Sequence, residues 1–365
     1  MLCLLKAHGS NLNSAMDSLH ILQVNSYKII SLMSRILLAL IFIITLCSQV
    51  NAQDTPGKTA KAFIRKGDYN NAILVLNRAI LNDSENIELK KDLAFAYYMQ
   101  REFQKSINTI KPVVDSRDAD VQSYQILGMA YKAVDENKEA ERMYKAALRK
   151  FPESGVLYND YGELQWIRND FSAASKLWLR GIQTDQNYPG NYYNAARYYY
   201  MTEDKVWGLL YGEIFLNLES YSRRTPEIKG MLVEGYKKLF SDNDITKNQD
   251  NRNEFVKAYL NIIKTHSQVV DRGVTPDALS ALRTRFILSW YPKQSTDFPF
   301  RLFDYHKQLA KAGLFDAYNQ WIFGAASNLS TFQQWTTTHS EEYNKFTTFQ
   351  KSRVYKVPEG QWYNK

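Results

Sequence analysis

The sequence predicts an all-α protein built from a tandem array of helix hairpins, followed by a helical C-terminal region. Two observations lead to this prediction. One stretch has the residue pattern of a paired-helix hairpin, and the same pattern returns in register on both sides of it. The 365-residue chain is 45% hydrophobic and 14% aromatic, which is enough apolar material for a large buried core.

The best-formed hairpin occupies residues 121–154. Its small and apolar residues recur at helical spacing in two runs, which are Leu127, Gly128 and Tyr131, then Ala140, Tyr144 and Ala147. The small Gly128 and Ala140 let two antiparallel helices approach closely, and Pro152 ends the second helix. A single hairpin of this kind leaves one apolar face uncovered, so neighbouring copies are expected on both sides.

The hairpin is about 34 residues long. Counting in both directions from it by this length gives five consecutive units: 53–86, 87–120, 121–154, 155–188 and 189–220. The fifth unit is degenerate, because Gly208 and Gly212 take the small positions of its second helix. The array resembles the tetratricopeptide repeat (TPR) family. The resemblance implies a right-handed superhelical solenoid of about five hairpins, whose first helices line a concave groove for a peptide or protein.

The repeat is no longer visible in residues 221–365. Their pattern predicts a helical region that caps the end of the array. Within this region, residues 301–326 contain small, aromatic and small residues at the same intervals as in the second helix of a hairpin. This segment is either a sixth, degenerate repeat or an ordinary helical hairpin that uses small residues in the same way. Residues 353–365 predict an extended tail, whose aromatic residues are expected to dock onto the body.

Residues 1–52 contain the features of a secretory signal. A short basic stretch beginning at Met33 precedes an apolar run at 36–46, and small residues lead to an expected cleavage point after Ala52. We expect Met33 to be the true start and the protein to be exported, periplasmic or secreted, with no stable membrane span after cleavage. An uncleaved anchor and a lipoprotein signal ending at Cys47 are the alternatives.

The mature chain offers little catalytic or metal-binding chemistry. Both cysteines, Cys3 and Cys47, lie in the N-terminal segment, which excludes a disulfide framework, a cysteine-bound zinc site and a catalytic cysteine after cleavage. The remaining histidines are far apart in sequence and lack metal-binding spacing: His266, His306 and His339. We find no nucleotide-binding or hydrolase motif, so the sequence predicts no enzyme activity and no cofactor.

The charge pattern argues against nucleic acid as a partner. The formal net charge is +8, but lysines and arginines are scattered among acidic residues instead of forming a block. We interpret this excess as solvation of helix faces, and expect no nucleic-acid binding.

The TPR resemblance implies that the first helix of each hairpin alternates buried positions with positions that face the groove. At those positions the chain has large amphipathic side chains typical of peptide or protein recognition. The predicted groove residues are Lys91, Phe95, Tyr98, Gln125, Met129, Lys132, Asn159, Glu163, Trp166, Tyr193, Arg197 and Tyr200. Packing against the next helix or the C-terminal region is the competing explanation for Trp166, Tyr193 and Tyr200.

The sequence therefore predicts a non-enzymatic TPR scaffold of the cell envelope or secreted fraction that binds a protein or peptide. One alternative is an envelope enzyme with a site in the C-terminal region around His306, Trp321 and His339. Another is a structural spacer that stacks against itself, so the oligomeric state stays open.

Overall fold

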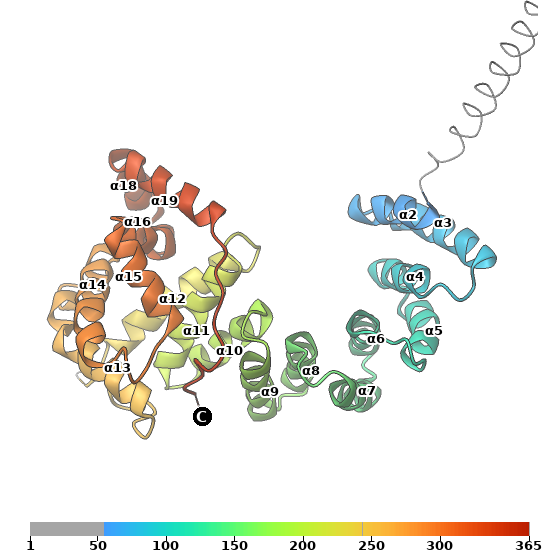
Figure 1. Cartoon of the computed structure of the whole chain (residues 1–365), viewed down its shortest axis with the longest axis horizontal. Helices are drawn as coiled ribbons and strands as arrows, with labels where there is room; N and C mark the ends of the chain where they lie inside the picture. Colours follow the sequence, from blue (N-terminus) through green and yellow to red (C-terminus); the bar gives the residue numbers. More distant parts are fainter. Residues whose placement is uncertain (1–54, 243, 365) are drawn as a thin grey trace, which may run out of the picture. The chain divides into compact units, whose positions relative to one another are not determined.

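The structure is a computed structural model that describes residues 55–242 and 244–364. These residues are helical and contain no β-strand, which confirms the all-α prediction (Figure 1). The chain divides into two compact units, Met1–Ala79 and Ile80–Lys365. The predicted signal segment, 1–52, lies outside the described residues. Within the described part, no helix is both long enough and apolar enough to cross a membrane.

The first unit contains helix α2 (Pro56–Arg65) and most of α3 (Tyr69–Asn82). The two helices form a hairpin with a tight turn, in which the Asp68 backbone amide donates to the Phe63 carbonyl at 3.0 Å. Gly67 is in the left-handed region at this turn, with a φ of 76°, which glycine adopts without steric cost.

The second unit begins with four hairpins, each of which lies inside one of the predicted windows from 87 to 220. Their helices are α4 (Ile87–Met99), α5 (Phe103–Val114), α6 (Val121–Ala133), α7 (Asn137–Lys150), α8 (Gly155–Ile167), α9 (Phe171–Thr184), α10 (Pro189–Met201) and α11 (Lys205–Leu218). Within this unit, each first helix contacts the first helix of the next hairpin as well as its own second helix.

A side-chain cap that recurs with the repeat fixes the start of α4, α6 and α8, whereas α2 lacks it. The side chains of Asn86, Asp120 and Ser154 each accept a hydrogen bond from a backbone amide in the first turn of the following helix. In the fifth hairpin the cap is absent and Pro189 begins the helix instead. The repeat is therefore encoded at the helix ends as well as in the packed positions.

The turn inside each of the first four hairpins recurs with the same register. Arg101, Asp135 and Asn169 all have φ values near 60°, at the position that Gly67 occupies in the first hairpin. The residue after each of them donates its backbone amide to the carbonyl five residues earlier, which closes the end of the first helix.

Glycine in a first helix makes room for an aromatic ring from the second helix. A β-carbon at Gly128 would overlap the phenol of Tyr144, and one at Gly162 would overlap the indole of Trp178. Tyr144 and Trp178 are 0% and 2% exposed. The aromatic ring of the second helix therefore fills the space that each glycine leaves.

The fifth hairpin is degenerate, as the sequence predicted, and its turn carries a buried acid. Asp204 precedes α11, and one of its carboxylate oxygens, Oδ1, is buried with no hydrogen-bond partner among the described residues. Burial and the nearby Asp250 carboxylate raise the pKa of Asp204 to about 7.

We expect the wild-type protein to lose stability as the pH rises from about 5 to about 7, by on the order of 2 kcal/mol from this group. The folded-state pKa of Asp204 lies above its usual value of 3.8, so the protonated carboxyl favours the folded state, and this contribution disappears as the pH rises through about 7. Urea unfolding at several pH values should show that Asp204→Asn flattens this decline. A variant with the wild-type pH dependence would show that Asp204 is not responsible.

The C-terminal helices pack around α11 and do not form a separate core. They are α12 (Thr225–Leu239), α13 (Glu254–Thr265), η1 (Ser267–Val270), α14 (Pro276–Lys293), α15 (Arg301–Lys311), α16 (Phe315–Asn319), η2 (Gln320–Gly324), α17 (Ala325–Ser327), α18 (Leu329–Thr338) and α19 (Ser340–Ser352). One continuous apolar core runs from Ala174 to Val357. The predicted division between 189–220 and 221–365 therefore falls inside this core.

The segment 301–326 contains a hairpin with the turn of the repeats. Gly313 has a φ of 67°, and the Leu314 amide donates to the Leu309 carbonyl at 2.9 Å, as at the corresponding place in the array. The second helix differs, because α16 passes into the π-helical turn η2 after one short stretch.

Candidate functional site

The candidate site is the surface formed by α4, α6, α8 and α10, which we call the first-helix face. These helices contact one another in succession, and α10 continues the series to α12. All twelve predicted groove residues lie on these four helices. Their side chains differ greatly in how exposed they are to a partner.

Two of the predicted polar residues are buried. Lys91 is 3% exposed, and its ammonium lies 2.6 Å from the Asp120 carboxylate and 2.5 Å from that of Glu88. Asn159 is 4% exposed and accepts a hydrogen bond from the Asn194 side chain at 2.9 Å. Their interpretation as groove contacts is therefore corrected, because both side chains are used to join one hairpin to the next.

Polar links also connect α6 to α8. Gln125 donates to the Asp160 carboxylate at 3.2 Å, and the Lys132 ammonium lies 3.0 Å from the Glu163 carboxylate. Burial raises the pKa of Asp160, although Lys132 opposes this effect. Because Glu163 keeps 40% of its side chain exposed, this pair contributes little stability and leaves a polar group at the surface.

The predicted aromatic residues are half-buried and are held by ring contacts. The Trp166 ring centroid lies 4.6 Å from that of Phe171 and 5.6 Å from that of Trp178. Tyr98 packs on Phe103 at 5.5 Å. Each ring is held by its neighbours and is only half-buried, which is a low-entropy arrangement for recognition.

The other predicted side chains fall into the same half-buried class. Phe95 and Met129 pack against the core of the second and third hairpins. Tyr200 lies beneath the Lys238 ammonium, which is 4.0 Å from its ring centroid. Lys238 comes from α12, so the C-terminal region contributes a charge at this end of the face.

A charged and aromatic group ends the first-helix face at α10 and α12. The Tyr193 hydroxyl donates to the Glu227 carboxylate at 2.6 Å, and Arg197 lies 3.2 Å from the same group. Arg224 stacks over Tyr193 at 4.6 Å. Arg197 retains 39% side-chain exposure beside this carboxylate.

The most exposed apolar residues of these four helices are not among the predicted groove residues. Met99, Ile167 and Met201 end α4, α8 and α10 and are 40%, 55% and 68% exposed. They occupy the same position of the repeat, one residue after the predicted Tyr98, Trp166 and Tyr200, so the repeat register could have identified them.

The three residues of the alternative enzyme site differ in their exposure and contacts. His306 is 3% exposed in the core, whereas His339 is exposed and stacks on Trp335 with ring centroids 4.5 Å apart. Trp321 is buried beneath the Lys229 ammonium, which lies 3.9 Å from its ring centroid. His306 and Trp321 both pack on Tyr318, with ring centroids 5.8 and 5.9 Å from its own, whereas the ring contact of His339 is with Trp335.

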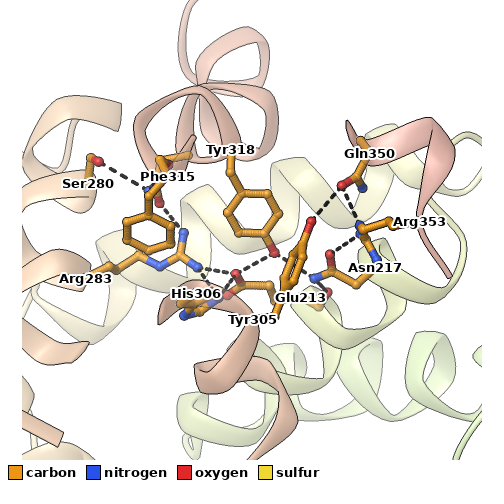
Figure 2. Close-up of polar contacts among 11 residues, drawn as sticks. Glu213, Asn217, Ser280, Arg283, Tyr305, His306, Phe315, Tyr318, Gln350 and Arg353 are labelled. Carbon is orange, nitrogen blue, oxygen red and sulfur yellow. Dashed lines mark hydrogen bonds and ion pairs between the residues drawn. The ribbon is translucent and has the colours of Figure 1, made fainter. Parts of the chain in front are cut away.

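His306 belongs to a buried polar network that joins α11 to the C-terminal helices, shown in Figure 2. At its centre, the Glu213 carboxylate forms an ion pair with Arg283 and accepts a hydrogen bond from the Tyr318 hydroxyl at 2.9 Å. His306 Nε2 lies 2.6 Å from the same carboxylate oxygen. Asn217 donates to Tyr318 at 2.7 Å and extends the network towards the C-terminus.

The electrostatics of this network are those of a closed structural site. Burial would raise the pKa of Glu213, but Arg283 and His306 overcome this effect and hold it at about 2. Burial lowers the pKa of His306. All three side chains are at most 5% exposed and lie in the core. Among the described residues, no group of three or more potential ligands is arranged to hold a metal ion.

Comparisons with known proteins identify similar structures and no similar sequence. No family model and no curated protein matches the chain. The solved structures that it resembles include a TPR protein of Thermus thermophilus, TTC0263, with 16% identity, a TM-score of 0.41, and coverage of 50% of this chain and 97% of that one. MamA of Desulfovibrio magneticus has 13% identity and a TM-score of 0.36, covering 46% and 96%. YrrB, a TPR protein described as having an unusual peptide-binding site, has 12% identity and a TM-score of 0.36, covering 53% and 97%.

Proposed function

We propose that this protein is a non-enzymatic scaffold that binds a protein or peptide along the first-helix face. The observation that carries the proposal is the row of exposed apolar residues Met99, Ile167 and Met201 at one position of the repeat. Half-buried Tyr98, Trp166 and Tyr200 precede them along each helix.

The chemistry of this face favours a partner with both apolar and polar contacts. Flexible methionine and rigid aromatic rings supply apolar surface, and the partly exposed Glu163 and Arg197 supply charges of both signs. An amphipathic helix or an extended segment meets these requirements, since its anchors can follow the spacing of successive first helices.

We further propose that the protein acts in the cell envelope or after secretion. The signal features of residues 33–52 support this location, and a mature chain without cysteine is suited to an oxidising compartment.

The test compares wild-type protein with a Met99→Gln, Ile167→Gln and Met201→Gln variant. These side chains are exposed, so we expect circular dichroism to show an intact fold. Partners captured from an envelope extract by wild type should be identified, purified and titrated against both proteins. We expect the variant to bind at least about tenfold more weakly.

A matched control removes exposed charges from the second helices through Lys105→Ala, Lys138→Ala and Arg180→Ala. This variant should bind as wild type does. Equal loss of binding in both variants, or in neither, would show that the first-helix face does not hold the partner.

A further inference from the structure

The C-terminal tail, residues 353–364, is bound to the body of the second unit as an extended peptide. It follows the last helix, α19, and Figure 1 shows it running past α11 towards α10. Exposure alternates along its first part, because Val354 and Lys356 are exposed while Tyr355 and Val357 are 6% and 5% exposed. This period of two is that of a strand with one face buried. The docking predicted from the sequence is thus confirmed.

Side-chain amides of the body bind the backbone of the tail. Asn187, between α9 and α10, accepts from the Val357 amide at 2.9 Å and donates to the Val357 carbonyl at 3.3 Å. Asn253, at the start of α13, donates to the Tyr363 carbonyl at 2.6 Å. Such contacts recognise an extended backbone whatever its side chains, as a neighbouring strand does.

The end of the tail adds aromatic anchors after an exposed turn. Tyr363 stacks on Phe255 with ring centroids 4.7 Å apart, and its hydroxyl donates to the Pro299 carbonyl at 2.8 Å. Trp362 stacks over Tyr211 at 6.4 Å. Backbone bonds at two points combined with pockets for selected side chains are the features of a peptide-binding site.

The site is larger than the tail that fills it. A cavity of about 540 Å³ adjoins Tyr363, and its walls also include Phe255 and Phe298, with the charged Asp250 and Arg252 at the rim. An incoming segment could therefore make further contacts beyond those of Tyr363.

We propose that the tail is a ligand held in cis, and that the surface beneath it binds an extended segment of a partner protein with the same pattern. That pattern has two apolar anchors at alternate positions, matching Tyr355 and Val357, followed by adjacent aromatic residues that match Trp362 and Tyr363. While the tail is docked it blocks this second binding site, because its covalent attachment gives it a high effective concentration.

The test uses full-length protein with a protease site inserted between Ser352 and Arg353 and cut after folding. A fluorescent synthetic peptide of residues 353–365 serves as the probe. We expect the probe to bind the cut protein, after removal of the released tail, at least about tenfold more tightly than the uncut protein. A probe with Trp362→Ala and Tyr363→Ala should bind at least about tenfold more weakly.

The control probe carries Lys356→Ala and Glu359→Ala, which replace exposed tail residues, and should bind as the original does. Two outcomes would overturn the proposal. In one, the cut tail stays with the body through native chromatography and no probe enters. In the other, the body loses its helical circular dichroism when the tail leaves. Either result would show that the tail is an integral part of the core.

Discussion

Replacing Arg283 with methionine is expected to lower the free energy of unfolding by about 3 to 5 kcal/mol. Arg283 is the strongest counter-charge to Glu213, whose pKa of about 2 keeps it ionised at neutral pH. Methionine fills much of the same volume, but it leaves the carboxylate of Glu213, whose side chain is 5% exposed, without its ion pair. Urea unfolding followed by circular dichroism measures the loss.

Two further variants separate this effect from a simple change of volume. Arg285→Met alters an exposed arginine of the same helix, α14, and should change stability by less than about 0.5 kcal/mol. A double variant, Glu213→Gln with Arg283→Met, removes both charges and should recover part of the loss. If Arg283→Met is as stable as wild type, the buried ion pair does not hold α11 to α14.

Replacing Gly162 with valine is expected to destabilise the protein by about 1 to 3 kcal/mol. The new side chain would occupy the space of the Trp178 indole, which is 2% exposed and donates a hydrogen bond to the Asn159 carbonyl at 3.2 Å. The two helices of the fourth hairpin would have to separate, or the indole would have to leave its position. Thermal unfolding and tryptophan fluorescence should both report the change.

The matched control is Gly230→Ala in α12, where an added β-carbon meets open space. This substitution should stabilise the protein by up to about 1 kcal/mol, because alanine favours a helix interior. A destabilising Gly230→Ala variant together with a neutral Gly162→Val variant would contradict the packing described for these helices.

The repeat architecture could be predicted from the sequence because local packing enforces it at every period. Gly128 and Gly162 must be small to admit Tyr144 and Trp178, and such constraints are visible in one hairpin at a time. The tail was also predictable, since aromatic residues at a chain terminus gain by docking.

The C-terminal core could not be predicted in the same way. Glu213 and Arg283 are 70 residues apart, and no local pattern pairs them. The continuity of the core across residue 220 could not be predicted for the same reason, because α11 is covered by helices from distant parts of the chain. Neither feature recurs at a fixed interval along the chain, so a search for repeats could not detect it.

The repeat pattern predicted which helices carry the candidate residues, but not how exposed each side chain is. The repeat offset placed Lys91 and Asn159 on the first-helix face, yet each pairs with a neighbouring hairpin and is buried. The position of a residue within the repeat indicates which side of the helix its side chain is on. It does not indicate whether an adjacent residue covers that side chain. Met99 and Ile167 were missed because exposed apolar residues have no role in the packing pattern.

The dissociation constant of a purified partner for wild type and for the Met99→Gln, Ile167→Gln and Met201→Gln variant tests the proposed function most directly. Recognition along the first-helix face predicts a constant at least about tenfold larger for the folded variant. Equal constants for the two proteins would contradict it.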